Sequence, residues 1–151
     1  MRPRLAERMR VEQVGAEELA IFFIGQAGFV FKNSEGALLA LDLYLSDALE
    51  RSSEQFRRMA PTLLEPEEVD ADLMLVTHNH PDHLDPDAFP IFARHPRMFF
   101  VGAPDCAKPF HRVGIPPERQ AILRPGERWE GYGFSIRATF SDHGESAPEA
   151  V

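Results

Sequence analysis

The sequence predicts an α/β fold in which short helices pack on a sheet of buried strands. The apolar end of residues 72–76 has the composition of a strand buried on both faces, as in a parallel sheet. A dense polar cluster at residues 77–85 follows it directly, where ligand sites collect in open α/β sheets. Apolar runs at 19–24 and 98–101 predict further strands of the same sheet.

The chain begins with a charged segment that is expected to precede the domain. Residues 1–18 contain four arginines and have a mild helical tendency, which favours a short helix or an irregular lead-in. A basic arm that touches a partner is the alternative, but a solvated terminus is the simpler interpretation. The domain itself is expected to cover residues 19–151.

Three strands are expected to open the sheet as an antiparallel unit. The run at 19–24 ends at Gly25, a second strand covers 28–32, and a third covers 37–43. Between the last two, the Asn-Ser-Glu-Gly sequence at 33–36 has the composition of a hairpin turn. Such a turn joins antiparallel neighbours.

Helices are expected on both sides of the polar cluster. Ser46 can cap a helix that runs towards Met59, before Pro61 ends it. Asp85 and Pro86 suit the cap and the first position of a second helix. The remaining elements are expected to be a strand at 98–101, a helix at 104–113, and short strands at 120–123, 128–130 and 133–140.

The polar cluster has the side chains and the spacing of a metal site. His78 and His80 lie two residues apart, so on an extended chain they point to the same side. Pro81 makes the chain turn, and Asp82 and His83 then return towards the same point. Imidazoles and a carboxylate suit zinc, with manganese or iron as alternatives. Four ligands are too many for one open catalytic metal and suit two adjacent ions.

Two other interpretations of the cluster are less favoured. A polar surface loop would require this spacing to arise by chance after an apolar strand. A structural zinc site usually recruits thiolates, and the chain has one cysteine, Cys106. Like His95 and His111, Cys106 lies outside the cluster and is expected to be a packed or surface residue.

His78-x-His80-x-Asp82-His83 resembles the signature of the metallo-β-lactamase fold superfamily. The resemblance extends from about Leu19 to the end of the chain. It implies an αββα sandwich, two sheets packed face to face with helices outside, of which this sequence supplies the N-terminal portion. Within the superfamily the chain is similar to the L-ascorbate-6-phosphate lactonase-like branch, at residues 25–29, 41–47, 101–106, 114–119 and 141–144.

The resemblance also implies roles for individual side chains. It places His78, His80 and His143 on one metal ion, and Asp82 and His83 on a second. It further gives Asp82 the transfer of a proton to the leaving oxygen. For His143 the alternative is an ordinary residue of a surface loop.

Two further residues are expected to support this centre. In the superfamily an aspartate at the position of Asp42 holds the metal loop through hydrogen bonds, and a carboxylate in an apolar strand needs such partners. Gln26, between Gly25 and Gly28, is expected at the rim of the metal pocket. Its alternative is an idle side chain in a tight glycine turn.

The implied activity is that of a metal-dependent hydrolase with two divalent ions, zinc or manganese. A metal-bound hydroxide would attack a lactone or ester, a phosphorylated sugar lactone being one candidate. One alternative is a phosphodiesterase or nuclease of the same fold. The other is an inactive, truncated module that binds metal or a partner without turnover.

Composition restricts the partners and the compartment. The net charge of −8 and the pI near 5.2 argue against a nucleic-acid surface, which requires a basic stripe. No apolar run reaches membrane-spanning length, so no membrane is expected, and a single cysteine fits a reducing cytoplasm.

The resemblance predicts that this chain needs a complement. The superfamily's second half brings an aspartate that bridges both metals and a last histidine, and neither has a counterpart here. One sheet would also leave an apolar face uncovered. A missing C-terminal half, a second chain or a homo-oligomer is therefore expected to complete the fold.

Overall fold

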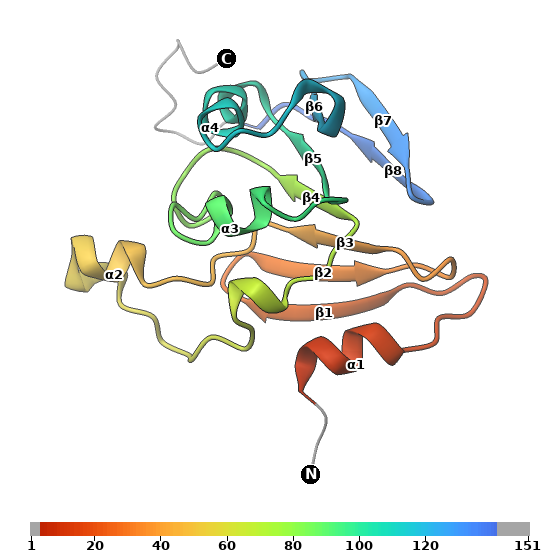
Figure 1. The fold of residues 1–151 in the computed structure, drawn as a ribbon, viewed down its shortest axis with the longest axis horizontal. Helices are drawn as coiled ribbons and strands as arrows, with labels where there is room; N and C mark the ends of the chain where they lie inside the picture. The colour runs from red at the N-terminus through yellow and green to blue at the C-terminus, as the bar shows by residue number, and fades with distance from the viewer. Residues whose placement is uncertain (1–3, 142–151) are drawn as a thin grey trace.

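The computed structural model describes residues 4–141, which form one six-stranded sheet, a separate β-hairpin and short helices (Figure 1). The strands follow one another across the sheet in chain order. The sheet consists of β1 (Ala20–Gly25), β2 (Gly28–Lys32), β3 (Leu38–Leu41), β4 (Leu73–Val76), β5 (Phe99–Gly102) and β6 (Gln120–Ile122), and the hairpin of β7 (Arg128–Gly131) and β8 (Phe134–Arg137). The helices are α1 (Leu5–Val11), α2 (Ala48–Ser52), α3 (Phe89–Ala93) and α4 (Ala107–Arg112).

The predicted α/β class and the antiparallel opening of the sheet are both confirmed. Strands β1, β2 and β3 pair antiparallel, whereas β3 to β6 pair parallel. The turn between β2 and β3 is closed by Asn33, whose Oδ1 accepts hydrogen bonds from Glu35 N and Ala37 N. Gly36 has a φ of 85°, which glycine adopts without strain.

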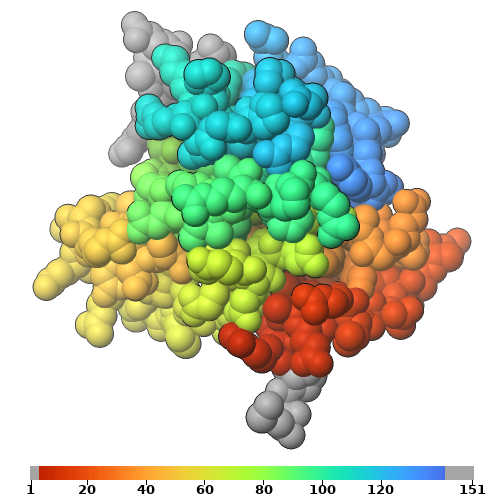
Figure 2. Space-filling model, in the orientation of Figure 1, coloured from red at the N-terminus to blue at the C-terminus, as the bar shows by residue number. Residues whose placement is uncertain are grey.

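One face of the sheet packs against the helices and forms the larger core. Side chains from β2, β4 and β5 meet α3 and α4 there, and the rings of Phe89 and Phe110 stack with centroids 5.3 Å apart. In Figure 2 the segments that carry α1, α3 and α4, in red, green and teal, cover this side of the molecule. Gly102 is required by the packing of α4, because an added Cβ would lie 2.8 Å from atoms of Cys106 and Phe110.

The opposite face of the sheet is apolar too, as expected of parallel strands. Leu39, Leu73 and Val101 are buried in a second core beneath the β7–β8 hairpin, where Trp129 stacks on Phe99 at 5.1 Å. The cover is incomplete at the other end of the sheet. There the two outward side chains of β1, Ile21 and Phe23, are 59% and 58% exposed.

The helix predicted from Ser46 towards Met59 is wrong in length, because α2 ends at Ser52 and contains no buried residue. Without an apolar face to bury, a helix of this length gains little from packing. Ser53 is extended, with φ −163° and ψ 136°, and its hydroxyl caps a separate 3-10 turn, η1 (Glu54–Phe56).

The helix predicted to begin at Pro86 begins three residues later, at Phe89. Asp85 does act as a cap, since its Oδ1 accepts from the backbone N–H groups of Asp87 and Ala88, but the capped residues form a turn. The helix predicted at 104–113 starts as a 3-10 turn, η3 (Pro104–Cys106). No helix among residues 4–141 is long and apolar enough to cross a membrane.

Candidate metal centre

The histidine-rich loop begins where β4 ends, at the carboxyl edge of the parallel strands. Aspartates follow the two strands that flank β4. Asp42 comes directly after β3, and Asp105 lies in η3, after β5. An ionised carboxylate has no hydrogen to donate. Each aspartate can therefore accept hydrogen bonds from the N–H and O–H groups of the loop.

His78 and His80 face each other in the bends that follow β4. His78 Nε2 lies 3.0 Å from His80 Nδ1, and the two rings meet edge to face with centroids 4.6 Å apart. Two nitrogens bound to one tetrahedral zinc at its usual bond lengths lie about 3.3 Å apart. The pair is therefore close to the separation that a shared ion would require.

Thr77 fixes which nitrogen of His78 points towards His80. The Thr77 hydroxyl donates its single hydrogen to Asp42 Oδ2, 2.6 Å away. It lies 3.0 Å from His78 Nδ1 and can therefore only accept there, which places the proton on Nδ1. A neutral His78 then presents the lone pair of Nε2, the atom that faces His80.

Asp42 holds both ends of the turn. Its buried carboxylate accepts from Thr77 N at 2.8 Å and from His83 Nδ1 at 2.9 Å, in addition to the Thr77 hydroxyl. The backbone of Asp42 is left-handed, with φ 45°, a conformation that ends β3 and that a non-glycine residue adopts at a cost. His83 Nε2, the nitrogen that Asp42 does not hold, lies 3.6 Å from Asp82 Oδ2.

The hydrogen bond to Asp42 is the main reason why the pKa of His83 is raised above its ordinary value. Burial of the ring opposes the shift, and the charges of Asp42 and Asp82 add to it. The charged form of His83 therefore stabilises the metal-free fold. This contribution is complete at pH values below the pKa of an unfolded histidine, about 6.5. That contribution is lost as the pH rises through the folded pKa.

We expect an NMR titration of the metal-free protein to give His83 a pKa above its ordinary value. Asp42→Asn should lower that pKa, because the amide accepts the same hydrogen bond without a charge. Metal affinity should rise with pH across the same interval, since a proton on His83 competes with a cation. A His83 pKa that is unchanged in Asp42→Asn would contradict this account.

Asp85 joins the loop to the segment after β3. It is fully buried, and its carboxylate accepts five hydrogen bonds, from Leu45 N, Ser46 N, Ser46 Oγ, Asp87 N and Ala88 N. The sequence indicated the local cap and missed the long-range bonds to Leu45 and Ser46. The position of Asp85 beside the apolar residue Leu84 could have indicated these bonds, because a buried carboxylate needs hydrogen-bond partners.

Other residues singled out in the sequence comprise two exposed side chains, a buried cysteine and one residue outside the described part of the chain. Gln26 is exposed in the β1–β2 turn with a φ of 51°, which a glycine would adopt more readily. His143 lies outside the described residues. Cys106 is fully buried, and burial raises the pKa of its thiol, which keeps it protonated and unsuited to metal binding. His111, on α4, is exposed.

The loop's donors, imidazole nitrogens and a carboxylate at one edge of the sheet, are of the chemical type that suits a borderline divalent cation such as zinc. In the part of the chain that the structure describes, however, no group of three or more His, Cys, Asp or Glu side chains is arranged to hold a metal ion. The arrangement supplies the facing pair His78 and His80 and an oriented His83.

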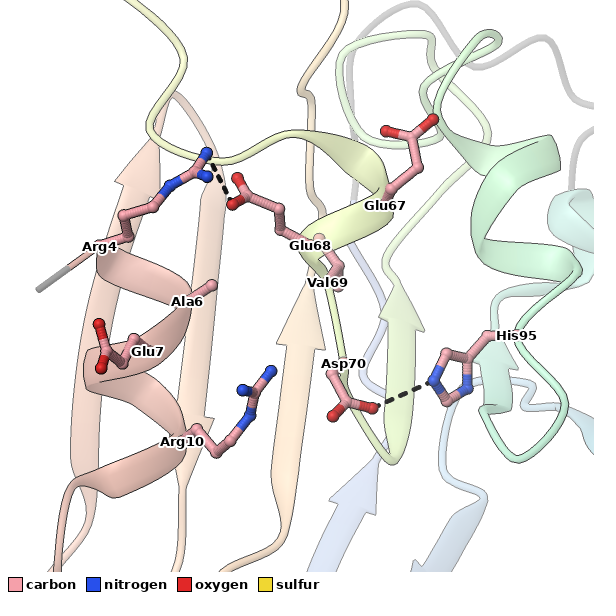
Figure 3. Close-up of a pocket in the computed structure, with 9 residues that line it drawn as sticks. All are labelled: Arg4, Ala6, Glu7, Arg10, Glu67, Glu68, Val69, Asp70 and His95. Carbon is pink, nitrogen blue, oxygen red and sulfur yellow. Dashed lines mark hydrogen bonds and ion pairs between the residues drawn. The ribbon is translucent and has the colours of Figure 1, made fainter.

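A cavity of about 440 Å³ lies elsewhere, at the opposite end of β4 (Figure 3). An ion pair joins Arg4 to Glu68 at 2.8 Å, and His95 Nε2 lies within hydrogen-bond distance of Asp70 Oδ1, at 3.1 Å. Its walls come from α1, from the segment before β4 and from His95, and none of them belongs to the histidine-rich loop. Ligand chemistry in such sheets gathers at the carboxyl edge, which this cavity does not touch.

Comparison with known proteins links the chain to lactonases. No protein-family model matches it. The probable L-ascorbate-6-phosphate lactonase UlaG of Escherichia coli O45:K1 is 26% identical, in a match that covers 82% of this chain and 41% of that protein. Its counterpart in Salmonella heidelberg is 25% identical with the same coverage. The chain thus spans about two fifths of the length of the curated relatives it matches.

A solved structure of a novel metallo hydrolase from the archaeon Ignicoccus hospitalis matches 73% of this chain and 41% of its own. The sequence identity is 21% and the TM-score 0.47. The lactonase matches cover most of the chain. They confirm the resemblance drawn from the sequence: this chain is similar to the L-ascorbate-6-phosphate lactonase-like branch of the metallo-β-lactamase fold.

Proposed function

We propose that this chain provides the metal-binding part of a hydrolase that opens a lactone or cleaves an ester. The observation that carries the proposal is the facing pair His78 Nε2 and His80 Nδ1, 3.0 Å apart at the carboxyl edge of the sheet. The similarity to probable L-ascorbate-6-phosphate lactonases supports the choice of a lactone. A phosphorylated sugar lactone is the proposed substrate class.

The proposed ligands are those of the histidine-rich loop together with His143. His78, His80 and His143 would hold one divalent ion, and Asp82 and His83 a second, with zinc or manganese as the metals. Bound ions would supply Lewis acidity, which polarises the carbonyl and makes water a stronger nucleophile near neutral pH. The cytoplasm is the proposed compartment, in line with the single, buried Cys106.

The protein's own groups prepare the ligands. Thr77 and Asp42 hold the Nδ1 protons of His78 and His83, so both rings offer Nε2 when neutral. Asp82 is half-buried at the turn, beside His83, where its carboxylate can take a proton from water and return it to the leaving oxygen. Gln26 would line the rim of the pocket.

The test of this function is a substrate panel with and without Zn²⁺ or Mn²⁺. Lactone hydrolysis that a chelator abolishes would support the proposal, whereas cleavage of phosphodiesters alone would favour the related phosphodiesterases and nucleases. The reading frame of the gene is determined first, because a further segment with a Gly-Asp pair after a strand and a later histidine would supply the missing metal ligands. Where the frame continues, the extended protein is assayed beside this chain.

Replacing Asp82 by asparagine is expected to lower kcat about 100-fold or more with a small change in KM. The amide keeps the size of the side chain but cannot accept and return a proton. Steady-state kinetics on a preparation that hydrolyses a lactone measure both constants. Asp87→Asn is the matched control, since Asp87 is exposed and its carboxylate pairs with Arg51. Intact kcat with a raised KM in Asp82→Asn would end the proton-transfer role.

A further inference from the structure

Asn79 lies between the two facing histidines and is held by the carboxylate of Asp105, in the turn after β5. The Asn79 backbone N–H donates to Asp105 Oδ2 at 3.0 Å. The Asn79 side-chain amide also reaches the Asp105 carbonyl oxygen, at 3.5 Å. These contacts join residues 26 positions apart and fix the backbone at the midpoint of the histidine pair.

Asp105 is itself placed by tight packing at the end of β5. It sits in η3, and the next residue, Cys106, is fully buried with its Sγ 3.9 Å from Val76 O, the last residue of β4. Gly102 brings this turn close to the sheet, because any larger residue would meet Cys106 at 2.8 Å. The backbone at Asp105 is therefore positioned by the packing of Cys106 and Gly102 in the core.

The loop is thus held from two sides by carboxylates. Asp42, from the β3 side, holds Thr77 and His83, while Asp105, from the β5 side, holds Asn79. Carboxylate acceptors of this kind make stronger hydrogen bonds to N–H groups than neutral acceptors do. Of the two, only Asp105 contacts the residue that separates His78 from His80.

We propose that Asp105 is a positioning residue that sets the spacing of His78 and His80 by fixing the backbone of Asn79. This inference rests on the proposed function, because the spacing of the two rings matters only if they share a metal ion. The spacing itself is a property of the metal-free chain and can be measured there.

The first measurement uses metal-free protein and NMR. Asp105→Ala is expected to speed exchange of the Asn79 amide about tenfold, because one hydrogen bond is lost. The cross-relaxation between the His78 and His80 rings should weaken with it. Asp105→Asn retains one carbonyl acceptor and should restore most of both signals. Asp87→Ala is the matched control, and thermal unfolding confirms that each variant is folded. Unchanged exchange and ring contact in Asp105→Ala would overturn the proposal.

The second measurement titrates Co²⁺ and follows its visible absorption. The dissociation constant is expected to rise about tenfold in Asp105→Ala and to return towards the parent value in Asp105→Asn. Equal affinities in the parent protein and Asp105→Ala would overturn the positioning role. A parent protein that binds no Co²⁺ would refute the proposed function, and the NMR result would still decide whether Asp105 sets the histidine spacing.

Discussion

Replacing His80 by alanine is expected to remove one bound divalent ion per chain, with an affinity loss of roughly 100-fold or more. His80 Nδ1 faces His78 Nε2 at 3.0 Å, and each ligand supplies one of the few bonds to a metal ion. His78→Ala should have the same effect. Elemental analysis after dialysis against Zn²⁺ or Mn²⁺ measures the bound metal.

His111→Ala is the control for this experiment. His111 is an exposed histidine on α4, outside the loop, and its loss should leave the metal content unchanged. Unchanged metal in His80→Ala, or an equal loss in His111→Ala, would end the assignment of the loop as the metal site.

The second large effect is expected in the solution behaviour of residues 1–151. Expressed alone, they should self-associate or be partly disordered, bind metal weakly and show no hydrolysis. The reason is the apolar outer face of the sheet, where Phe23 packs on Phe29 at 5.2 Å, yet Phe23 and Ile21 remain more than half exposed. Burying such surface is favourable at about 25 cal/mol per Å².

Sedimentation velocity, metal analysis and an esterase assay test this expectation together. The double variant Ile21→Thr, Phe23→Thr should reduce self-association, because threonine keeps the strand propensity and removes apolar area. Met59→Thr is the matched control, since Met59 is 95% exposed in a loop away from the sheet. A monodisperse, fully metallated and active monomer would contradict the need for a complement.

The strands were predictable from the sequence because burial on both faces leaves a continuous apolar run. Leu73 to Val76 is such a run, and in the structure it pairs parallel with β3 and β5. The helix from Ser46 was predicted too long because a cap indicates where a helix begins, whereas its length depends on a buried face. That face is absent in α2.

The nearness of His78 and His80 was suggested by their spacing, but β4 ends at Val76, so the extended chain assumed for the pair is absent. The supports of the pair depend on strand order, which a single sequence does not display. An aspartate in an apolar run indicated that Asp42 needs partners, but only the family resemblance pointed to the metal loop, and the bond from Asn79 to Asp105 was not predicted. Had the order β3-β4-β5 been known, an aspartate just after β5 would have been the natural residue to examine.

The coincidence of strand order with chain order bears on how the loop is built during synthesis. Each strand after β1 pairs with the strand synthesised just before it, so the sheet can form from β1 onwards without pairing between distant segments. Asp42 precedes Thr77 by 35 residues and is therefore synthesised before the histidines. Asp105 follows Asn79 by 26 residues. The loop therefore acquires its first anchor at once and its second only after β5 has been translated.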